Sequence, residues 1–453
     1  MQKQRIGLNT DICGYCHKFA EALPEKVPEY LSAICAGLFI VTPFFIGAFC
    51  MILKNADFLV YGYPFAIEHI VWPIAAVLGV VSMLLYCIKG NSKCKHIKTT
   101  LKTNPAFVCF LFLSIWMIAA TSVNGWNGWV LSGAGFRHET IFMQLGYFCL
   151  LFPSAVIIKN ATVKWWIVRV FEFTSLFLVI VAFVLWKTQL TSQIISWKQQ
   201  FSAIFSNTNY YGYYLAVSVS LSAAGFVAET RIGWKLLSAF SVCANSVALA
   251  FNNTMGAWVA CFVAIVFLLI AHAIIEHKLN WQVAVVFLIF AVSLYLPGHI
   301  QGHFENNIVQ LGNDIIKIAE NAEGAKSAGS GRWQLWTTAG KMIISHPLFG
   351  IGFEGIDVND LKEFAGNYRV HNEYLQYALF YGIPAGLAYF AGCLTVYLRA
   401  LKRRHKLDPV SLVCLTGAFG YLVSAFFGLT LFGTAPLLFI FLGMGYQRAE
   451  KGE

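Results

Sequence analysis

The sequence predicts an all-α, polytopic integral membrane protein with about 12 transmembrane helices. Of its 453 residues, 58% are hydrophobic and only 12% are charged, whereas a soluble domain has about a quarter of its residues charged. Apolar runs of about 20 residues, the length that crosses a bilayer, recur along the chain. Trp and Tyr often lie near the ends of these runs, where the membrane interface favours their amphipathic rings. Most of the surface is therefore expected to face lipid.

The expected elements follow in order along the chain. The N-terminal tail, residues 1–30, is polar and has no apolar core, so we expect no cleavable signal peptide. Spans 1–9 occupy residues 31–296, spans 10–12 occupy residues 373–447, and a short tail covers 448–453. The individual spans are expected near 31–53, 64–88, 105–123, 141–158, 166–187, 208–228, 236–251, 255–275, 282–296, 373–398, 410–427 and 434–447.

The net charge of +10 is interpreted as a topology signal, and no nucleic-acid partner is expected. Most of the 32 Lys and Arg residues lie in alternate connections between the apolar runs, ending with a cluster at 399–406. Short loops rich in basic residues mark the cytoplasmic side of a membrane protein. Both termini are therefore expected in the cytoplasm, and anionic membrane lipids are expected partners.

One connection is much longer than the others. Residues 297–372 are too polar to span a membrane, and loops of that length without a role are uncommon. Apolar residues at helical spacing in 304–319 and 332–345 predict two amphipathic helices on the membrane surface. With both termini inside, this segment is an external loop between spans 9 and 10.

The candidate functional residues are polar groups expected on the external face. An Arg guanidinium grips phosphate oxygens with two parallel hydrogen bonds. A histidine just before a helix lies at its positive end, which favours anions and the neutral imidazole that a general base needs. Such a set suits a phosphorylated, lipid-linked substrate. The candidate catalytic residues are His371 and Arg332, and the candidate substrate-binding residues are Arg137, Asn372, Asn207 and Asn209.

Each of these residues also has a simpler interpretation. An arginine at the membrane boundary often binds lipid phosphate, and Asn372 and Asn207 can cap helices. Glu172, inside a span, can pair with Arg169 one turn earlier. The pattern Cys13–His17 matches a haem-attachment motif, but it falls in the predicted cytoplasmic tail, so we expect no haem. No second Cys/His pair completes a metal site. The combination of polar groups on one face is what favours a function.

On these residues the sequence resembles the O-antigen ligase family, which includes related polysaccharide polymerases. The resemblance runs from about residue 110 to 447 and is strongest at SGRWQLWTTAGKMIISHPLFGIGFEGI (330–356) and VHNEYLQYALFYGIPAG (370–386). GFRHE (135–139) and FSNTNYYG (205–212) also look like features of the family. One stretch departs from it: NNTMGAW (252–258) has Thr254 and Met255 where many members carry a Ser-Arg pair.

The resemblance implies a metal-independent glycan transferase of the bacterial plasma membrane that needs no cofactor. Its donor would be a glycan on undecaprenyl pyrophosphate. The hydroxyl of an acceptor glycan or lipid-linked glycan would attack the anomeric carbon and displace the lipid pyrophosphate, with inversion. Arg332 and Arg137 would hold the pyrophosphate, and His371 would activate the acceptor. A ligase and a polymerase share this chemistry and differ in acceptor, and the choice stays open.

Two other classes of protein also stay open. A transporter or flippase of lipid-linked sugars often has twelve spans, but such proteins show paired halves, and the long loop has no counterpart in the first half of this chain. A membrane scaffold without catalysis would explain the spans but not the polar set on one face.

Overall fold

The computed structural model is helical throughout the part of the chain that it describes, with no strand there. It describes residues 22–53, 66–88, 104–133, 139–188, 201–205, 207–320, 323–356, 364, 368–429, 431 and 433–446. Among these, nine helices are long and apolar enough to cross a membrane. They are α2 (Val27–Leu53), α4 (Trp72–Ile88, with the preceding turn η2, Ile67–Val71), α6 (Pro105–Asn124), α9 (Ala161–Thr188), α10 (Thr208–Ala228), α11 (Ile232–Asn252), α12 (Met255–Glu276), α13 (Trp281–Ile300) and α17 (Ile383–Lys402).

Three shorter apolar helices belong to the same bundle: α8 (Ile141–Val156), α18 (Pro409–Ala425) and α19 (Ala435–Gly445). Each residue of α19 is buried, and α18 packs between α10 and α19. The polytopic, all-α fold class predicted from the sequence is therefore confirmed. The additional short helix α7 (Gly128–Ser132) follows α6.

Small residues at the centre of the bundle allow helices α10 and α18 to approach closely. Gly420 faces Ser220 and Gly417 faces Leu221, so closely that a Cβ at either glycine would crowd its neighbour. Because lipid tails are as apolar as leucine, helices in a membrane associate mainly through such close packing. This contact holds the first half of α10 next to the end of α18, where the candidate site lies.

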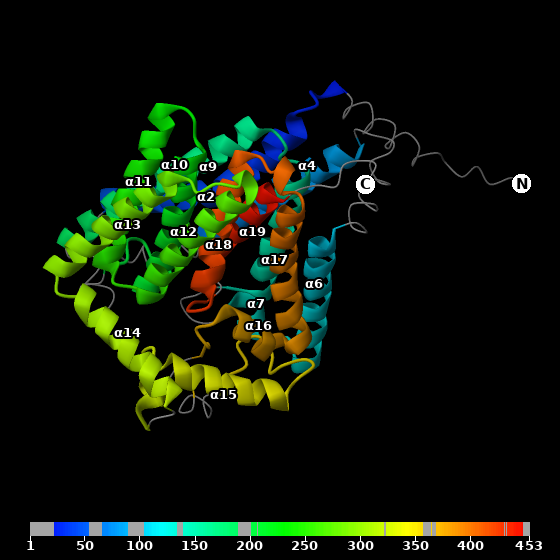
Figure 1. Cartoon of the computed structure of the whole chain (residues 1–453). Coiled ribbons are helices and arrows are strands. Elements are labelled where there is room, and N and C mark those ends of the chain that lie inside the picture. Colours follow the sequence, from blue (N-terminus) through cyan, green and yellow to red (C-terminus); the bar gives the residue numbers. More distant parts are fainter. Residues whose placement is uncertain are drawn as a thin grey trace, which may run out of the picture.

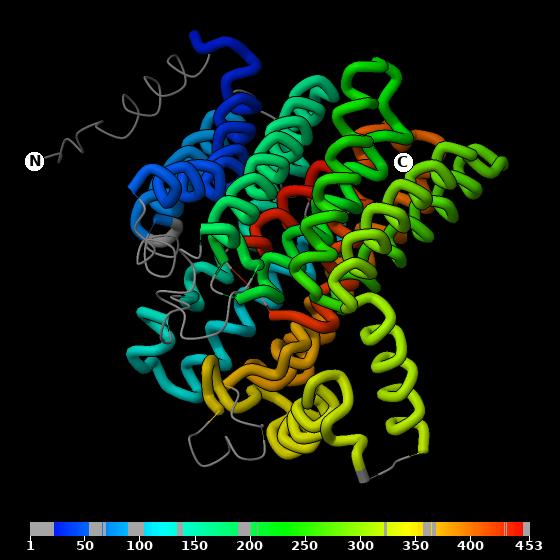
Figure 2. The backbone as a smooth tube through the Cα atoms, turned by 90° about the vertical axis from the view of Figure 1, so that its left-hand side faces the viewer, coloured from blue at the N-terminus to red at the C-terminus, as the bar shows by residue number. Residues whose placement is uncertain are grey.

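The long connection contains the two helices expected from its apolar spacing, α14 (Phe304–Ala319) and α15 (Arg332–Ser345), with the short η5 (Glu323–Ser327) between them. Figure 1 shows α14 sloping away from the end of α13 and α15 lying across one end of the bundle, beside α16 (Glu373–Tyr381). The second view agrees (Figure 2). Apolar side chains of α14 are exposed, among them Val309 and Ile315. Such an apolar stripe suits a helix that lies on a membrane surface.

The expected tenth span, 373–398, is two helices, α16 and α17, which meet at Gly382. This glycine has a φ of 89°, and a Cβ on it would lie 1.8 Å from the carbonyl oxygen of Leu348. The apolar pattern of the sequence continues through the break, so periodicity could not reveal it. Glycine is the residue that tolerates both the left-handed backbone and the close approach.

The loop after α15 runs into this break and satisfies the main-chain groups that it frees. The N–H of Ile383 donates to the carbonyl of Pro347 at 2.8 Å, and the N–H of Ile351 donates to that of Leu379 at 2.9 Å. The indole of Trp116 on α6 donates to the carbonyl of Tyr381 at 3.0 Å. Irregular backbone is tolerated at membrane depth only where protein satisfies it in this way. The loop thereby ties α15 to the end of α16 and the start of α17.

Candidate functional site

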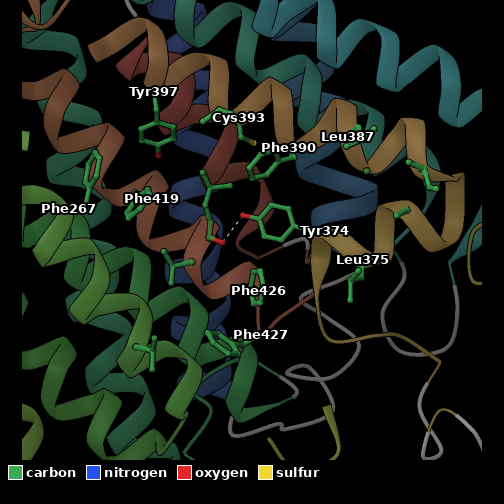
Figure 3. A pocket seen from close by; sticks show the side chains of 17 residues that line it. Phe267, Tyr374, Leu375, Leu387, Phe390, Cys393, Tyr397, Phe419, Phe426 and Phe427 are labelled. Carbon is green, nitrogen blue, oxygen red and sulfur yellow. Dashed lines mark hydrogen bonds between the residues drawn. The ribbon is translucent and has the colours of Figure 1, made fainter. Parts of the chain in front are cut away.

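A groove between α12, α16–α17 and α18 has a volume of about 800 Å³ (Figure 3). We call it the apolar groove, and its lining is almost wholly hydrophobic. The hydroxyl of Tyr374, which donates to the carbonyl of Leu422 at 2.8 Å, is one of its few polar groups. The largest side chains that line it are Phe267, Tyr374, Phe390, Tyr397, Phe419, Phe426 and Phe427.

One end of the apolar groove is the turn Phe426–Phe427 after α18, where the first turns of several helices meet. The hydroxyl of Tyr213, near the start of α10, donates to the carbonyl of Phe427. Gly256, near the start of α12, lies against the ring of Phe427. The rings of Trp336 and Phe426 are 5.7 Å apart. Because helix N-termini present unpaired N–H groups and a positive dipole end, this region favours an anion.

Arg332 is placed at this end of the groove. It is the first residue of α15 and follows Gly331, which takes the left-handed conformation (φ 82°) that glycine tolerates. Its half-buried side chain lies near the hydroxyl of Tyr213. One turn later, the indole N–H of Trp336 is buried and has no hydrogen-bond partner among the described residues. A cation and an unused donor thus lie beside the mouth of an apolar groove.

His371 and Asn372 lie at the same end of the bundle, at the start of α16. The side chain of Asn372 caps this helix, accepting from the N–H of Leu375 at 3.0 Å. His371 is half-buried and has a φ of 54°, which is uncommon for a residue with a side chain. Three residues later, the ring of Tyr374 lies 6.0 Å from that of Phe426. The helix that begins at Arg332 and the helix that begins just after His371 therefore both contact the turn Phe426–Phe427, through Trp336 and Tyr374.

A buried ionic cluster holds the segment that leads to His371. The guanidinium of Arg369 donates to Glu139 at 2.7 Å and, through Nε, to Glu354 at 2.8 Å. Arg369 is only 2% exposed, Glu139 1% and the side chain of Glu354 0%. Burial opposes the charge on Arg369, but the carboxylates of Glu354 and Glu139 outweigh it and hold its pKa above the ordinary value.

This cluster joins three separate parts of the chain: the segment before α8, the loop after α15 and the approach to α16. In it, two carboxylates face the guanidinium of Arg369. The N–H of Val370 is also fixed, donating to the side chain of Gln376 at 2.9 Å. We infer that these contacts impose the unusual backbone conformation of His371.

The carboxylate of Glu373 is held on the inner side of α16. Tyr389 on α17 donates to one of its oxygens at 2.7 Å, and Tyr421 on α18 donates to the other at 2.8 Å. Glu373 is fully buried. Hydrogen bonds of this kind offset the cost of burying a charge, and these two fix α16 against its neighbours.

The other residues named from the sequence have varied placements. Asn207 caps α10, accepting from the N–H of Asn209 at 2.8 Å, so the simpler interpretation holds for its side chain, as it does for Asn372. Arg137 lies outside the described residues. Met255 packs against the core as an apolar residue. Glu172 pairs with Arg169 at 2.5 Å, as the helical spacing indicated.

Sequence reasoning missed Arg369, Glu139, Glu354 and Tyr213. Arg369 stands directly before the VHN motif, and Glu139 and Glu354 lie inside quoted motifs. A charged residue beside an apolar run was the available signal. Only the fold shows that Arg369, Glu139 and Glu354 lie together. Among the described residues, no three His, Cys, Asp or Glu side chains lie close enough together to hold a metal ion.

These features define a polytopic membrane protein with an apolar, lipid-sized groove that opens towards a cationic site at one end of its helical bundle. Residues 239–390 match a family model described as O-Antigen ligase. This match agrees with the resemblance found in the motifs and supports an assignment of this part of the chain to the O-antigen ligase family. The matched segment includes Arg332, His371 and Asn372. A search of the curated proteins found no match.

The match and the apolar helices together support a multi-pass membrane protein of the O-antigen ligase or polymerase type.

Proposed function

We propose that the protein transfers a glycan from undecaprenyl pyrophosphate to an acceptor hydroxyl on the external face of the bacterial plasma membrane. The observation that carries the proposal is the position of Arg332. Its guanidinium stands where the apolar groove ends, beside Tyr213 and the unused indole N–H of Trp336. A polyprenyl diphosphate has this same sequence of parts: a long apolar chain joined to a charged head.

In this arrangement the lipid chain lies in the apolar groove and the diphosphate lies against Arg332. The acceptor oxygen forms a bond with the anomeric carbon, on the face opposite to the bond between that carbon and the phosphate oxygen. That second bond breaks, its electron pair leaves with the lipid diphosphate, and the configuration inverts. His371 accepts the proton of the acceptor hydroxyl, a role that contributes about 10²–10⁴-fold in rate. No metal ion enters these steps, since Arg332 compensates the charge on the leaving diphosphate.

The distribution of basic residues supports placing this end of the bundle outside. Helix α17 starts at Ile383, in the lining of the apolar groove, and ends at Lys402 after 20 residues. At 1.5 Å per residue this helix is about 30 Å long, the thickness of the hydrocarbon core. The basic cluster at 399–406 therefore lies at the opposite end, which is the cytoplasmic one by the distribution of positive charge.

The test is transfer by the purified protein from a lipid-linked oligosaccharide to an added acceptor, followed by the mass of the products. Arg332→Gln and His371→Ala are expected to lower the rate by about 10²-fold or more. Matched controls are Lys341→Gln, an exposed cation on the same helix α15, and His346→Ala, an exposed histidine at its end. Both controls are expected to keep the wild-type rate. Full activity in Arg332→Gln and His371→Ala would exclude the proposal.

The same products separate a ligase from a polymerase. Transfer of a whole glycan to an acceptor that carries no polyprenyl chain would identify a ligase. Growth of the glycan on a second lipid-linked unit would identify a polymerase. Movement of the intact donor across the membrane of a vesicle, without any broken bond, would favour a flippase instead.

A further inference from the structure

A second cavity continues the apolar groove towards the other end of the bundle. Its volume is about 200 Å³, and it lies between α12, α17 and the start of α18. Phe267 and Tyr397 line both cavities. The second cavity reaches Arg404 and Leu407, at the basic end of the molecule. The two cavities therefore follow one path along the bundle and are separated at the level of these two rings.

The separation is a packed cluster of three aromatic side chains, which we call the aromatic floor: Phe267, Tyr397 and Phe419. The rings of Phe267 and Phe419 are stacked with centroids 4.3 Å apart. Tyr397 meets Phe267 edge-on at 5.8 Å and Phe419 at 5.7 Å. The hydroxyl of Tyr397 donates to the carbonyl of Leu415 at 3.0 Å, which fixes the orientation of its ring. Aromatic contacts of this kind stabilise the cluster beyond simple burial.

We propose that the aromatic floor sets how many isoprene units of the donor lipid the protein grips. This inference rests on the proposed function, because it takes the occupant of the apolar groove to be the polyprenyl chain of a lipid diphosphate. The charge complementarity at the opposite end, where Arg332 approaches Tyr213, orients that chain with its head outward and its tail towards the floor.

The volume of the groove gives the expected length. A group of the size of a methylene or a water molecule occupies about 30 Å³, so about 800 Å³ holds roughly 27 such groups. An isoprene unit has five carbons, and the groove therefore holds roughly five units. The rest of a longer chain leaves the groove sideways at the floor and enters the lipid.

The gain from each gripped unit comes from packing contacts rather than from the hydrophobic effect, because the chain is already in lipid before it binds. Contacts of about 0.1–0.2 kcal/mol per atom pair sum to a small gain in binding free energy for each isoprene unit. We expect each gripped unit to lower KM by about five-fold. Units beyond the aromatic floor are surrounded by lipid both before and after binding, so they do not lower KM. The dependence of KM on chain length should therefore level off.

The experiment uses the full-length protein and donors with roughly three, five, seven and eleven isoprene units. For the wild type, KM is expected to fall up to about five units and then to stay level. Phe267→Ala joins the two cavities and adds about 200 Å³, together with the volume of the lost ring. The fall in KM is then expected to extend to about seven units. Phe267→Leu, which preserves more of the packing, should give an intermediate result if the alanine variant is poorly folded.

The matched control is Phe262→Ala on the same helix. Phe262 pairs with Phe287 at 6.0 Å and lines a separate cavity of about 510 Å³ between α12 and α13. This control should keep the wild-type length dependence. Binding of polyprenyl diphosphates that carry no glycan, measured directly, should show the same levelling.

The outcomes separate the two proposals. The role of the aromatic floor would be overturned if donors of every length were transferred equally efficiently. It would also be overturned if Phe267→Ala and Phe262→Ala had the same dependence on donor length. In both cases the proposed transfer itself would stand. Length-dependent binding without any transfer would overturn the proposed function and leave the floor as a lipid-length reader. Neither binding nor transfer of any polyprenyl diphosphate would overturn both.

Discussion

Replacement of Arg369 by Met tests whether the buried ionic cluster is what holds the segment before His371. The variant keeps most of the side-chain volume but removes every hydrogen bond from the guanidinium to Glu139 and Glu354. The change removes the positive charge between two carboxylates, in surroundings where no partner is more than 5% exposed. Removing one partner of a buried ion pair costs about 3–5 kcal/mol, because it leaves an uncompensated buried charge. We expect a loss of stability in this range.

The assay is unfolding of the purified protein in detergent, by heat and by denaturant, as a function of pH. In the variant, the two buried carboxylates lose their cation, so their pKa values in the folded state rise above those in the unfolded state. A raised carboxylate pKa destabilises the fold at neutral pH, and the loss is recovered as the pH falls and both groups take up protons. The gap in stability between wild type and variant should therefore narrow towards acid pH.

The control is Lys278→Met, which removes a cation that is 72% exposed and pairs with Glu276 at 3.3 Å. An exposed pair contributes little, and the change is expected to stay below about 0.5 kcal/mol. The free energy of unfolding of Arg369→Met could instead lie within about 1 kcal/mol of the wild-type value at neutral pH, or its deficit could be independent of pH. Either result would show that the cluster does not hold this segment.

Three further substitutions test the helix break at Gly382, the helix cap at Asn372 and the hydroxyl of Tyr213. Gly382→Ala places a Cβ 1.8 Å from a main-chain oxygen at a φ of 89°, so the yield of monodisperse protein should fall sharply, whereas Gly340→Ala on an open face of α15 should be tolerated. Asn372→Ala removes a helix cap and should cost about 1 kcal/mol in unfolding experiments, with Asn372→Ser recovering most of it; equal stability of the two variants would contradict the cap. Tyr213→Phe removes the hydroxyl near Arg332 together with its hydrogen bond to the carbonyl of Phe427, so it should cost about 1 kcal/mol in stability and raise the KM for donor by about five- to ten-fold; an unchanged KM would place the diphosphate elsewhere.

Much of the fold could be predicted from the sequence because membrane insertion is governed by local composition. A run such as 208–228 coincides with α10 (Thr208–Ala228), since length and hydropathy decide whether a segment can cross. The helices at 304–319 and 332–345 were also predictable, because their apolar stripes repeat every turn. The resemblance to the O-antigen ligase family could be recognised from short motifs that keep their order along the chain.

The break at Gly382 and the meeting of Arg369 with Glu139 could not be predicted in the same way. The apolar pattern of 373–398 passes through the break unchanged, and the stop is imposed by a loop whose carbonyl lies against the glycine. Arg369 and Glu139 are 230 residues apart in the chain. No local preference brings such residues together; the packing of α8, α15 and α16 does.

By itself, the sequence determined a many-helix membrane protein, the segment that carries its polar residues, and the family that it resembles. These properties depend on composition and on residues close together in the chain. Only the tertiary structure decided that α15 and α16 contact one turn, that an apolar groove ends near Arg332, and that three aromatic rings close the other end of that groove. Those facts depend on contacts between distant helices, where shape and burial, rather than residue type alone, determine what each side chain meets.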